Sequence, residues 1–183
     1  MIAKNVLVPI ATGIEEIEAV TIVDVLRRAG LTVRVSTIEE REVIGANGIK
    51  IVADSDFLDE ALEDFDAIVV PGGSEAARRF AAHGGLGTAI KSFCHNNNLV
   101  AAICASPAVV LAPLGLLNQK KATCYPSLSD RIKNFVDERV VTDGNIITSQ
   151  GPGTAMAFAF RVVEFLAGEK IAHNLKRDII VGI

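Results

Sequence analysis

A cysteine at the end of an apolar run is the residue best placed for chemistry in this sequence. Cys104 follows the uncharged residues 99–103 and precedes Ala105, Ser106 and Pro107, an order typical of a buried strand that turns into a helix. Free N–H groups at the start of a helix favour a thiolate over a thiol, and a thiolate is both a nucleophile and a target for oxidation. The alternative is that Cys104 is a small, inert core residue, as many free cysteines are.

A glycine pair could complete a site for carbonyl chemistry. Gly72 and Gly73 carry no side chain, so a substrate could approach their N–H groups closely. Together with the N–H of Ala105 they could form an oxyanion hole. A tight turn after a strand is the alternative reading of the pair. Neither G-x-x-x-x-G-K-[ST] nor G-x-G-x-x-G occurs, and Gly151-Pro152-Gly153 is too short a signal to indicate phosphate binding.

Acidic residues near the N-terminus supply candidate proton donors. Thr12 and Glu15 have the spacing of a capping box, which predicts a helix that starts at Thr12, and Glu16 is expected to be solvated. Glu18 lies among apolar neighbours. If it faces a thiolate, desolvation and like charge will raise its pKa, and it could then shuttle a proton to a substrate oxygen in a coupled titration with the thiol. An exposed helix glutamate is the alternative for Glu18.

The three histidines are expected to lie on the surface. His83, His95 and His173 occupy polar helix-end contexts, and none neighbours Cys104 in the sequence. A Cys-His dyad would therefore depend on contacts that the sequence does not indicate.

The elements that must position these residues alternate between strands and helices. Asn47–Gly48 is a hairpin turn signal. The pattern predicts strands at 5–10, 31–38, 66–71, 99–103, 140–142 and 146–149, a hairpin over 43–53, and helices at 15–29, 74–82, 86–96, from about 107, and at 154–167.

Such alternation predicts a doubly wound three-layer α/β sandwich with a mainly parallel sheet. Ligands in this architecture bind beyond the carboxyl ends of the strands. The loops at 11–13, 72–74 and 104–106 would all emerge at that edge. The sequence thus predicts that Cys104, the glycine pair and the acidic helix start converge.

Composition limits the function classes. The 183 residues suit a single domain, 1–183, and a net charge of -4 gives no indication of a nucleic-acid or anionic-membrane surface. Three cysteines without C-x-x-C spacing argue against a disulfide framework or zinc site and fit a reducing compartment, so we expect a cytoplasmic protein. We identify no signal peptide, and residues 99–117, although uncharged, fit a strand and a buried helix better than a membrane span.

Five segments in family order resemble the ThiJ/PfpI superfamily, specifically its branch of parkinsonism-associated protein deglycases (the DJ-one branch). They are spread across nearly the whole chain, and the five together are far more specific to this superfamily than any one of them alone. The segments are ATGIEEIE (11–18), VDVLRRAG (23–30), VPGG (70–73), AAICASP (101–107) and TSQGPGT (148–154).

The resemblance implies a flavodoxin-like homodimer with Cys104 as the nucleophile on a strained elbow. It implies that Glu18 is the protonated partner of the thiolate and that Gly72, Gly73 and Ala105 supply N–H groups to an oxyanion. It also implies that Gly151, Pro152 and Gly153 contribute to the pocket and the dimer interface and that Arg28 lies at the dimer contact.

Two positions depart from patterns in the superfamily. Many relatives carry histidine where this chain has Tyr125, and a tyrosine can hydrogen-bond but cannot act as a base near pH 7. The protease-like branch has histidine directly after its cysteine, where this chain has Ala105, which argues against peptidase activity.

The resemblance implies an enzyme that needs no metal or organic cofactor. Its substrates would be methylglyoxal, glyoxal or their early adducts with proteins and nucleotides, and its product a hydroxy acid. The alternatives are a redox-sensing stress protein or chaperone, in which Cys104 is oxidised to a sulfinate, and a catalytically silent scaffold. Cys124 could resolve a Cys104 sulfenic acid as a disulfide if its loop lies over the pocket.

Overall fold

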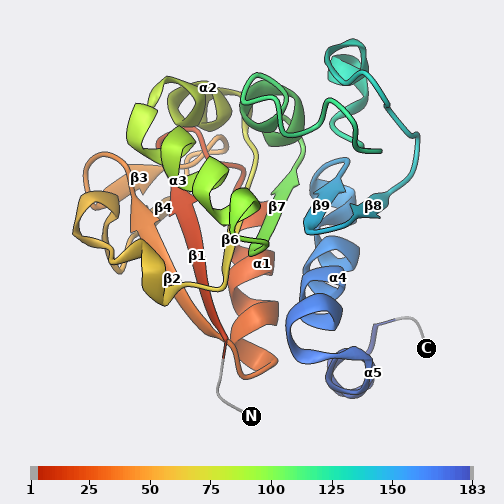
Figure 1. Ribbon diagram of the computed structural model, residues 1–183. Helices are drawn as coiled ribbons and strands as arrows, with labels where there is room; N and C mark the ends of the chain where they lie inside the picture. Colours follow the sequence, from red (N-terminus) through yellow and green to blue (C-terminus); the bar gives the residue numbers. More distant parts are fainter. Residues whose placement is uncertain (1–3, 182–183) are drawn as a thin grey trace.

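A mostly parallel seven-stranded sheet organises the protein. The computed structural model describes residues 4–181 (Figure 1). The strands lie in the order β5–β2–β1–β6–β7–β9–β8, with only β8 antiparallel to its neighbour, and β3 and β4 form a separate hairpin. The predicted α/β class is therefore confirmed.

The element bounds agree closely with most of the predicted ranges. The strands are β1 (Asn5–Ile10), β2 (Thr32–Thr37), β3 (Glu42–Ile44), β4 (Lys50–Val52), β5 (Ser55–Asp56), β6 (Ala67–Val70), β7 (Leu99–Ile103), β8 (Val140–Asp143) and β9 (Ile146–Ser149). The α-helices are α1 (Glu16–Arg28), α2 (Ser74–Ala82), α3 (Gly84–His95), α4 (Ala155–Ala167) and α5 (Glu169–Asp178).

Helices cover both faces of the sheet. Figure 1 shows α1 beside α4 and α2 beside α3. Consecutive residues of β1 pack in two apolar cores: Val6 and Val8 lie in the core that includes α1 and α4, and Leu7 between them lies in the core that includes α2 and α3. Since successive side chains of a strand point to opposite faces, every central strand is buried on both sides.

Two elements were not predicted, and one predicted helix is wrong. The helix expected from about residue 107 is a single π-helical turn, Pro107–Leu111, followed by turns. Pro113 cannot donate the next helical hydrogen bond, and Gly115 adopts a φ of +81°. Helix α5 was not predicted because only two of its side chains, Ala172 and Leu175, are buried. Strand β5 was not predicted because it is only two residues long.

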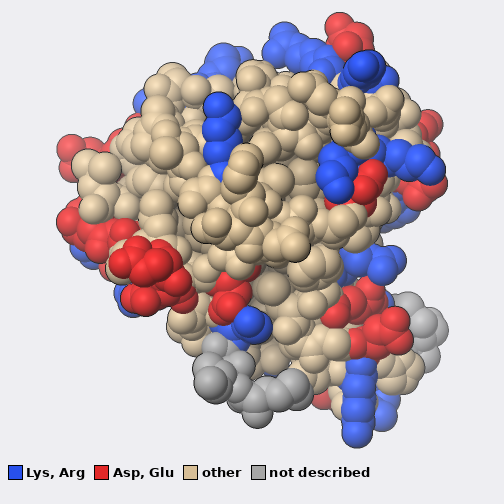
Figure 2. All heavy atoms as spheres, in the orientation of Figure 1, with Lys and Arg blue, Asp and Glu red and all other residues tan. Residues whose placement is uncertain are grey.

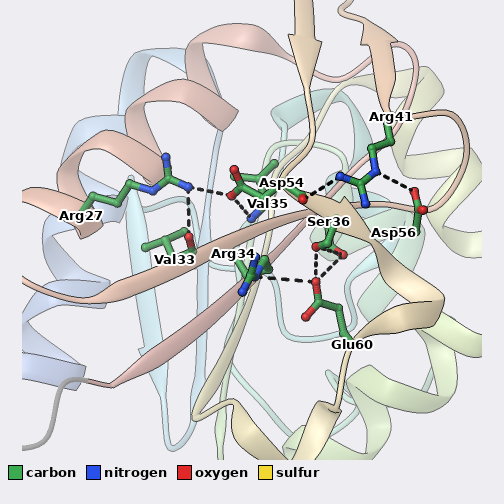
Figure 3. Close-up of polar contacts among 10 residues, drawn as sticks. Arg27, Val33, Arg34, Val35, Ser36, Arg41, Asp54, Asp56 and Glu60 are labelled. Carbon is green, nitrogen blue, oxygen red and sulfur yellow. Dashed lines mark hydrogen bonds and ion pairs between the residues drawn. The ribbon is translucent and has the colours of Figure 1, made fainter.

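The β5 edge of the sheet carries a network of charged side chains (Figure 3). Asp54 accepts a hydrogen bond of 2.8 Å from Arg27 on α1. The Glu60 carboxylate accepts a hydrogen bond of 3.1 Å from Ser36 on β2 and a second from Ser55 on β5. The edge strand is thereby fixed to its neighbour by side chains as well as by its backbone ladder.

Charge is spread unevenly over the surface. Figure 2 shows acidic side chains gathered on the left, over the segment between β4 and β6, and a largely uncharged region across the centre of the same face. Within residues 4–181, no helix is both long and apolar enough to traverse a bilayer.

Candidate active site

Cys104 occupies a sharp turn at the carboxyl end of β7. Its φ is +64°, a left-handed conformation that is uncommon outside glycine, and its exposed fraction is 9%. The Cys104 N–H donates to the Ser149 carbonyl at 2.9 Å, and its carbonyl accepts from the Tyr125 N–H at 2.8 Å. Two neighbouring segments therefore hold the strained backbone and fix the sulfur at this edge of the sheet.

Glu18 reaches the same edge from the first turn of α1 and is fully buried. Its Oε2 accepts a hydrogen bond of 2.7 Å from the Gly72 N–H, whereas its Oε1 has no partner in an N–H or O–H group of the described residues. The carboxyl lies beside Cys104, because a Cβ built on Gly72 would collide with both the Glu18 Oε2 and the Cys104 Cβ. The exposed-glutamate alternative is therefore wrong, and the structure brings Glu18 and Cys104 together.

Gly72 and Gly73 have different roles beside Cys104 and Glu18. A Cβ on Gly72 would lie 2.5 Å from the Cys104 Cβ and 2.6 Å from Glu18 Oε2. The space between these two residues therefore admits a glycine but no larger residue. Because its N–H is already bonded to Glu18, the expectation that Gly72 donates to a substrate oxyanion requires correction. The N–H groups of Gly73 and Ala105 remain candidate donors to an oxyanion, and both act to lower the pKa of the Cys104 thiol.

Gly73 could not be replaced without moving the loop. Its φ is +96°, and an added Cβ would collide with the Gly13 carbonyl and the Glu15 N–H. The close approach of the 11–15 loop to the 72–74 loop thus requires glycine at this position. Two of the three loops predicted to converge meet here.

Burial dominates the ionisation of the Cys104–Glu18 pair. It raises the pKa of Glu18 to about 7, as expected for a desolvated carboxyl. Burial, followed by the charge of Glu18, raises the pKa of the Cys104 thiol to about 12, although the Gly73 and Ala105 N–H groups oppose that rise. The N–H groups at the turn thus favour the thiolate, as expected, but burial opposes them. Because two negative charges repel at this distance, the pair holds one proton and one negative charge over a wide pH range.

A cavity of about 520 Å³ opens beside Cys104. All three predicted loops contribute to it, through Gly13, Gly73 and Ala105, and so do Tyr125 and Pro152. The remaining lining residues are Glu15, Ala46, Ser74, Glu75, Arg78, Ser127 and Leu128.

Gly151 brings the tyrosine ring close to the sulfur. A Cβ there would lie 3.3 Å from Tyr125 Cδ2 and 4.0 Å from Cys104 Sγ. Gly151 therefore lies next to both the Tyr125 ring and the sulfur, and a side chain there would crowd the ring.

The neighbouring acidic residues behave differently from the predictions. The N-cap of α1 is Glu15 and makes no side-chain cap hydrogen bond, while the Thr12 N–H donates to Glu39, so the predicted capping box does not form. Glu16 is buried rather than solvated, because Asn47 and Ile49 in the β3–β4 turn donate to its carboxylate. That contact brings the hairpin, including Ala46, to the cavity, and no local signal in the sequence indicated it.

Other candidate residues lie outside the cavity. Arg28 is exposed and pairs with Asp24 on α1 at 2.7 Å. Cys124 is buried, and burial followed by the charge of Asp130 raises its pKa to about 11. No histidine lines the cavity, and residues 4–181 contain no cluster of His, Cys, Asp and Glu able to hold a metal ion.

Comparisons with known proteins place this geometry in context. Residues 4–165 match the DJ-1/PfpI family. The chain is 43% identical to Protein DJ-1 homolog B of Arabidopsis thaliana over 97% of its own length but spans only 41% of that protein. It is 34% identical to the Caenorhabditis elegans protein named glutathione-independent glyoxalase DJR-1.2, covering 92% of this chain and 91% of that one. The solved structure described as Toxoplasma gondii DJ-1, oxidized, is 38% identical, with a TM-score of 0.96 over 99% of this chain and 100% of that chain.

Proposed function

The chain belongs to the DJ-1/PfpI family, and from that premise we propose that it is a cysteine-dependent glyoxalase or deglycase. Its substrates are methylglyoxal, glyoxal or their early adducts with proteins and nucleotides. The glyoxalase name of the C. elegans relative supports the reaction class. The observation that carries the proposal is the buried Cys104–Glu18 pair at the wall of a cavity.

The stable form of the pair carries its proton on sulfur, because the pKa of Cys104 lies above that of Glu18. The proposed reaction therefore starts with transfer of the Cys104 proton to the Glu18 carboxylate, which gives the reactive thiolate. The thiolate attacks the aldehyde carbon of methylglyoxal, and the N–H groups of Gly73 and Ala105 stabilise the oxyanion until Glu18 protonates it. The product of this step is a hemithioacetal.

Glu18 then moves protons between the two substrate carbons. Its carboxylate removes the C–H proton of the hemithioacetal to give an enediol, and the proton returns to the former ketone carbon. One carbon is oxidised as the other is reduced, so no external oxidant is required. Water hydrolyses the resulting thioester to lactate and frees the Cys104 thiol. The proposed reaction uses neither a metal nor an organic cofactor.

Replacement of Cys104 by serine tests this proposal. We expect Cys104→Ser to abolish lactate formation from methylglyoxal, followed by chiral analysis of the product. Cys94→Ser is the matched control, because Cys94 is half-buried on α3 and does not line the cavity. Retained lactate formation in Cys104→Ser would exclude the mechanism.

A redox role is the second candidate function. The unpartnered Glu18 Oε1, when protonated, could donate to a Cys104 sulfinate and stabilise it, and the T. gondii relative is described in an oxidised form. Two equivalents of peroxide would supply the two oxygens and leave as water. The intact mass after mild peroxide should rise by two oxygens, and Cys104→Ala should abolish the gain. Equal oxidation of Cys94 or Cys124, or a Cys104–Cys124 crosslink, would count against a sulfinate sensor.

We further propose that the protein is a homodimer that uses the outer surface of α1 and the β3–β4 hairpin. Val20 on α1 and Val52 on β4 are 55% and 67% exposed and line one groove with Asp24, the ion-pair partner of Arg28. Exposed apolar side chains gathered this way are typical of protein interfaces. Val20→Glu should give a monomer in sedimentation velocity, and Leu58→Glu, at an exposed apolar residue outside that groove, should not.

We also propose that the protein works in a reducing compartment such as the cytoplasm, and its free cysteines are consistent with this. Cys94, Cys104 and Cys124 are all free. Differential thiol labelling of protein taken directly from cells should therefore find Cys94 reduced.

A further inference from the structure

The cavity beside Cys104 is much larger than a small dicarbonyl requires. Methylglyoxal would fill only a minor part of about 520 Å³. The space beyond the reacting carbonyl is bounded on one side by α2 and on the other by Tyr125 and Ser127. A larger substrate would therefore place its remaining groups against these residues.

Among the residues that line the cavity, Arg78 on α2 is the one that carries a positive charge. It lies one helical turn after Ser74, so these two side chains share the face of α2 toward the cavity. Within residues 4–181, no ion pair or side-chain hydrogen bond joins Arg78 to another residue. Its guanidinium is thus free to bind a ligand.

The neighbouring arginine shows the contrast. Arg79 pairs with Glu75 at 2.7 Å and with Glu39 at 2.9 Å, and it does not line the cavity. Glu75, one of the two carboxylates at the cavity wall, is thus paired with Arg79. The other, Glu15, contacts the Asn47 amide at 3.5 Å, and burial raises its pKa. Within the described residues, neither carboxylate forms an ion pair with Arg78.

We propose that Arg78 binds an anionic group, a carboxylate or phosphate, carried by the same molecule as the reacting carbonyl. A planar guanidinium is suited to either group, and a partly enclosed cavity strengthens the contact. This inference rests on the proposed function and narrows it: the preferred substrates are dicarbonyls or adducts that carry a negative charge.

Turnover experiments measure this preference directly. Wild-type kcat/KM should be higher for α-oxoaldehydes with a terminal carboxylate or a phosphate ester than for neutral methylglyoxal. Arg78→Gln should reduce that anion-to-neutral ratio about tenfold, and Arg78→Lys should restore part of it. The matched control is Arg131→Gln, at an exposed arginine outside the cavity, which should leave the ratio unchanged. The carboxylate and phosphate substrates together identify which anion is preferred. No preference in the wild type, or an equal loss in Arg131→Gln, would overturn the inference.

Alkylation of Cys104 separates this inference from the proposed function, because it requires no turnover. Iodoacetate and iodoacetamide both form a carbon–sulfur bond to Cys104 and release iodide, but only iodoacetate is anionic. Peptide mass analysis distinguishes Cys104 from Cys94 and Cys124. Arg78→Gln should lower the iodoacetate-to-iodoacetamide rate ratio several-fold, whereas Arg131→Gln should not. An unchanged ratio in Arg78→Gln would refute the anion site even if methylglyoxal were turned over.

Discussion

Two buried glutamates in the first turn of α1 have opposite properties. Glu16 is 4% exposed and Glu18 is fully buried, and they are separated by one residue. Burial acts to raise the pKa of both carboxyls. At Glu16, hydrogen bonds from Asn47 and Ile49 outweigh burial, and the pKa is lowered. At Glu18 burial prevails and the pKa rises to about 7.

The number of donors explains the difference. Glu16 accepts from the Asn47 N–H at 2.7 Å, the Asn47 side-chain amide at 2.9 Å and the Ile49 N–H at 3.3 Å. Glu18 accepts one backbone hydrogen bond, and its other oxygen is left facing a thiol. A satisfied carboxylate is stable as an anion and serves the fold, whereas an underpartnered carboxylate holds a proton and is available for chemistry.

The largest expected effect is the loss of activity on neutralising Glu18. Glu18→Gln keeps the shape of the side chain but cannot exchange a proton, so turnover of methylglyoxal should fall about a hundred- to ten-thousand-fold. Glu16→Gln is the matched control and should keep most of its activity per folded molecule. Similar losses in both variants would show that the two carboxylates do not differ in role.

The next effect is a dependence of stability on pH. Because the pKa of Glu18 rises from 4.5 to about 7 on folding, the folded state binds more protons in that window. The contribution of Glu18 to the free energy of unfolding should therefore be fully present below pH 4.5 and fall by up to about 3 kcal/mol as the pH rises through 7.

Urea denaturation across this range measures that fall, and Glu18→Gln should remove it. The Glu16 contribution has the opposite sign: its lowered pKa stabilises the protein above pH 4.5, and this stability is lost on acidification. A wild-type stability that rises between pH 5 and 7 would contradict the assignment of Glu18.

A smaller loss of stability is expected at Glu16. Glu16→Gln retains one acceptor oxygen but places an amide group against the donors of the β3–β4 turn. We expect a destabilisation of about 2 kcal/mol, measured from urea midpoints at pH 7 with unchanged slope. A variant as stable as the wild type would mean that the buried carboxylate does not hold the hairpin.

The smallest effect should follow removal of one donor. Asn47→Ala deletes the side-chain hydrogen bond to Glu16 but keeps the backbone N–H bond, so the loss should be about 1 kcal/mol. The same variant should raise the pKa of Glu16, which shifts acid unfolding to higher pH. An unshifted acid transition would argue that the Asn47 amide does not set the ionisation of Glu16.

Local patterns predicted the strands and loops that form the site. The apolar runs that become β1, β6 and β7 are buried on both faces, and the glycine and cysteine loops follow directly from their carboxyl ends. Parallel strands with covered faces permit few other arrangements, so the convergence of Cys104, Gly73 and Gly13 could be predicted.

Long-range contacts explain what was missed. Thr12 and Glu15 have the spacing of a capping box, but Glu39 binds the Thr12 N–H instead. Glu16 resembles a surface glutamate because its partners lie some thirty residues away, in a hairpin turn. The ionisation of Cys104 also depended on burial, which outweighs the favourable N–H groups that its position in the sequence indicated.

The short, charged edge strand β5 has a consequence for behaviour at high concentration. An open sheet edge can recruit a strand from another molecule and start aggregation. Here the edge is two residues long and is flanked by Asp54 and Glu60, with Arg41 donating to the Asp54 carbonyl at 2.9 Å (Figure 3). A foreign strand would have to bury these charges and displace their partners. The β5 edge therefore offers a foreign chain little template for extending the sheet.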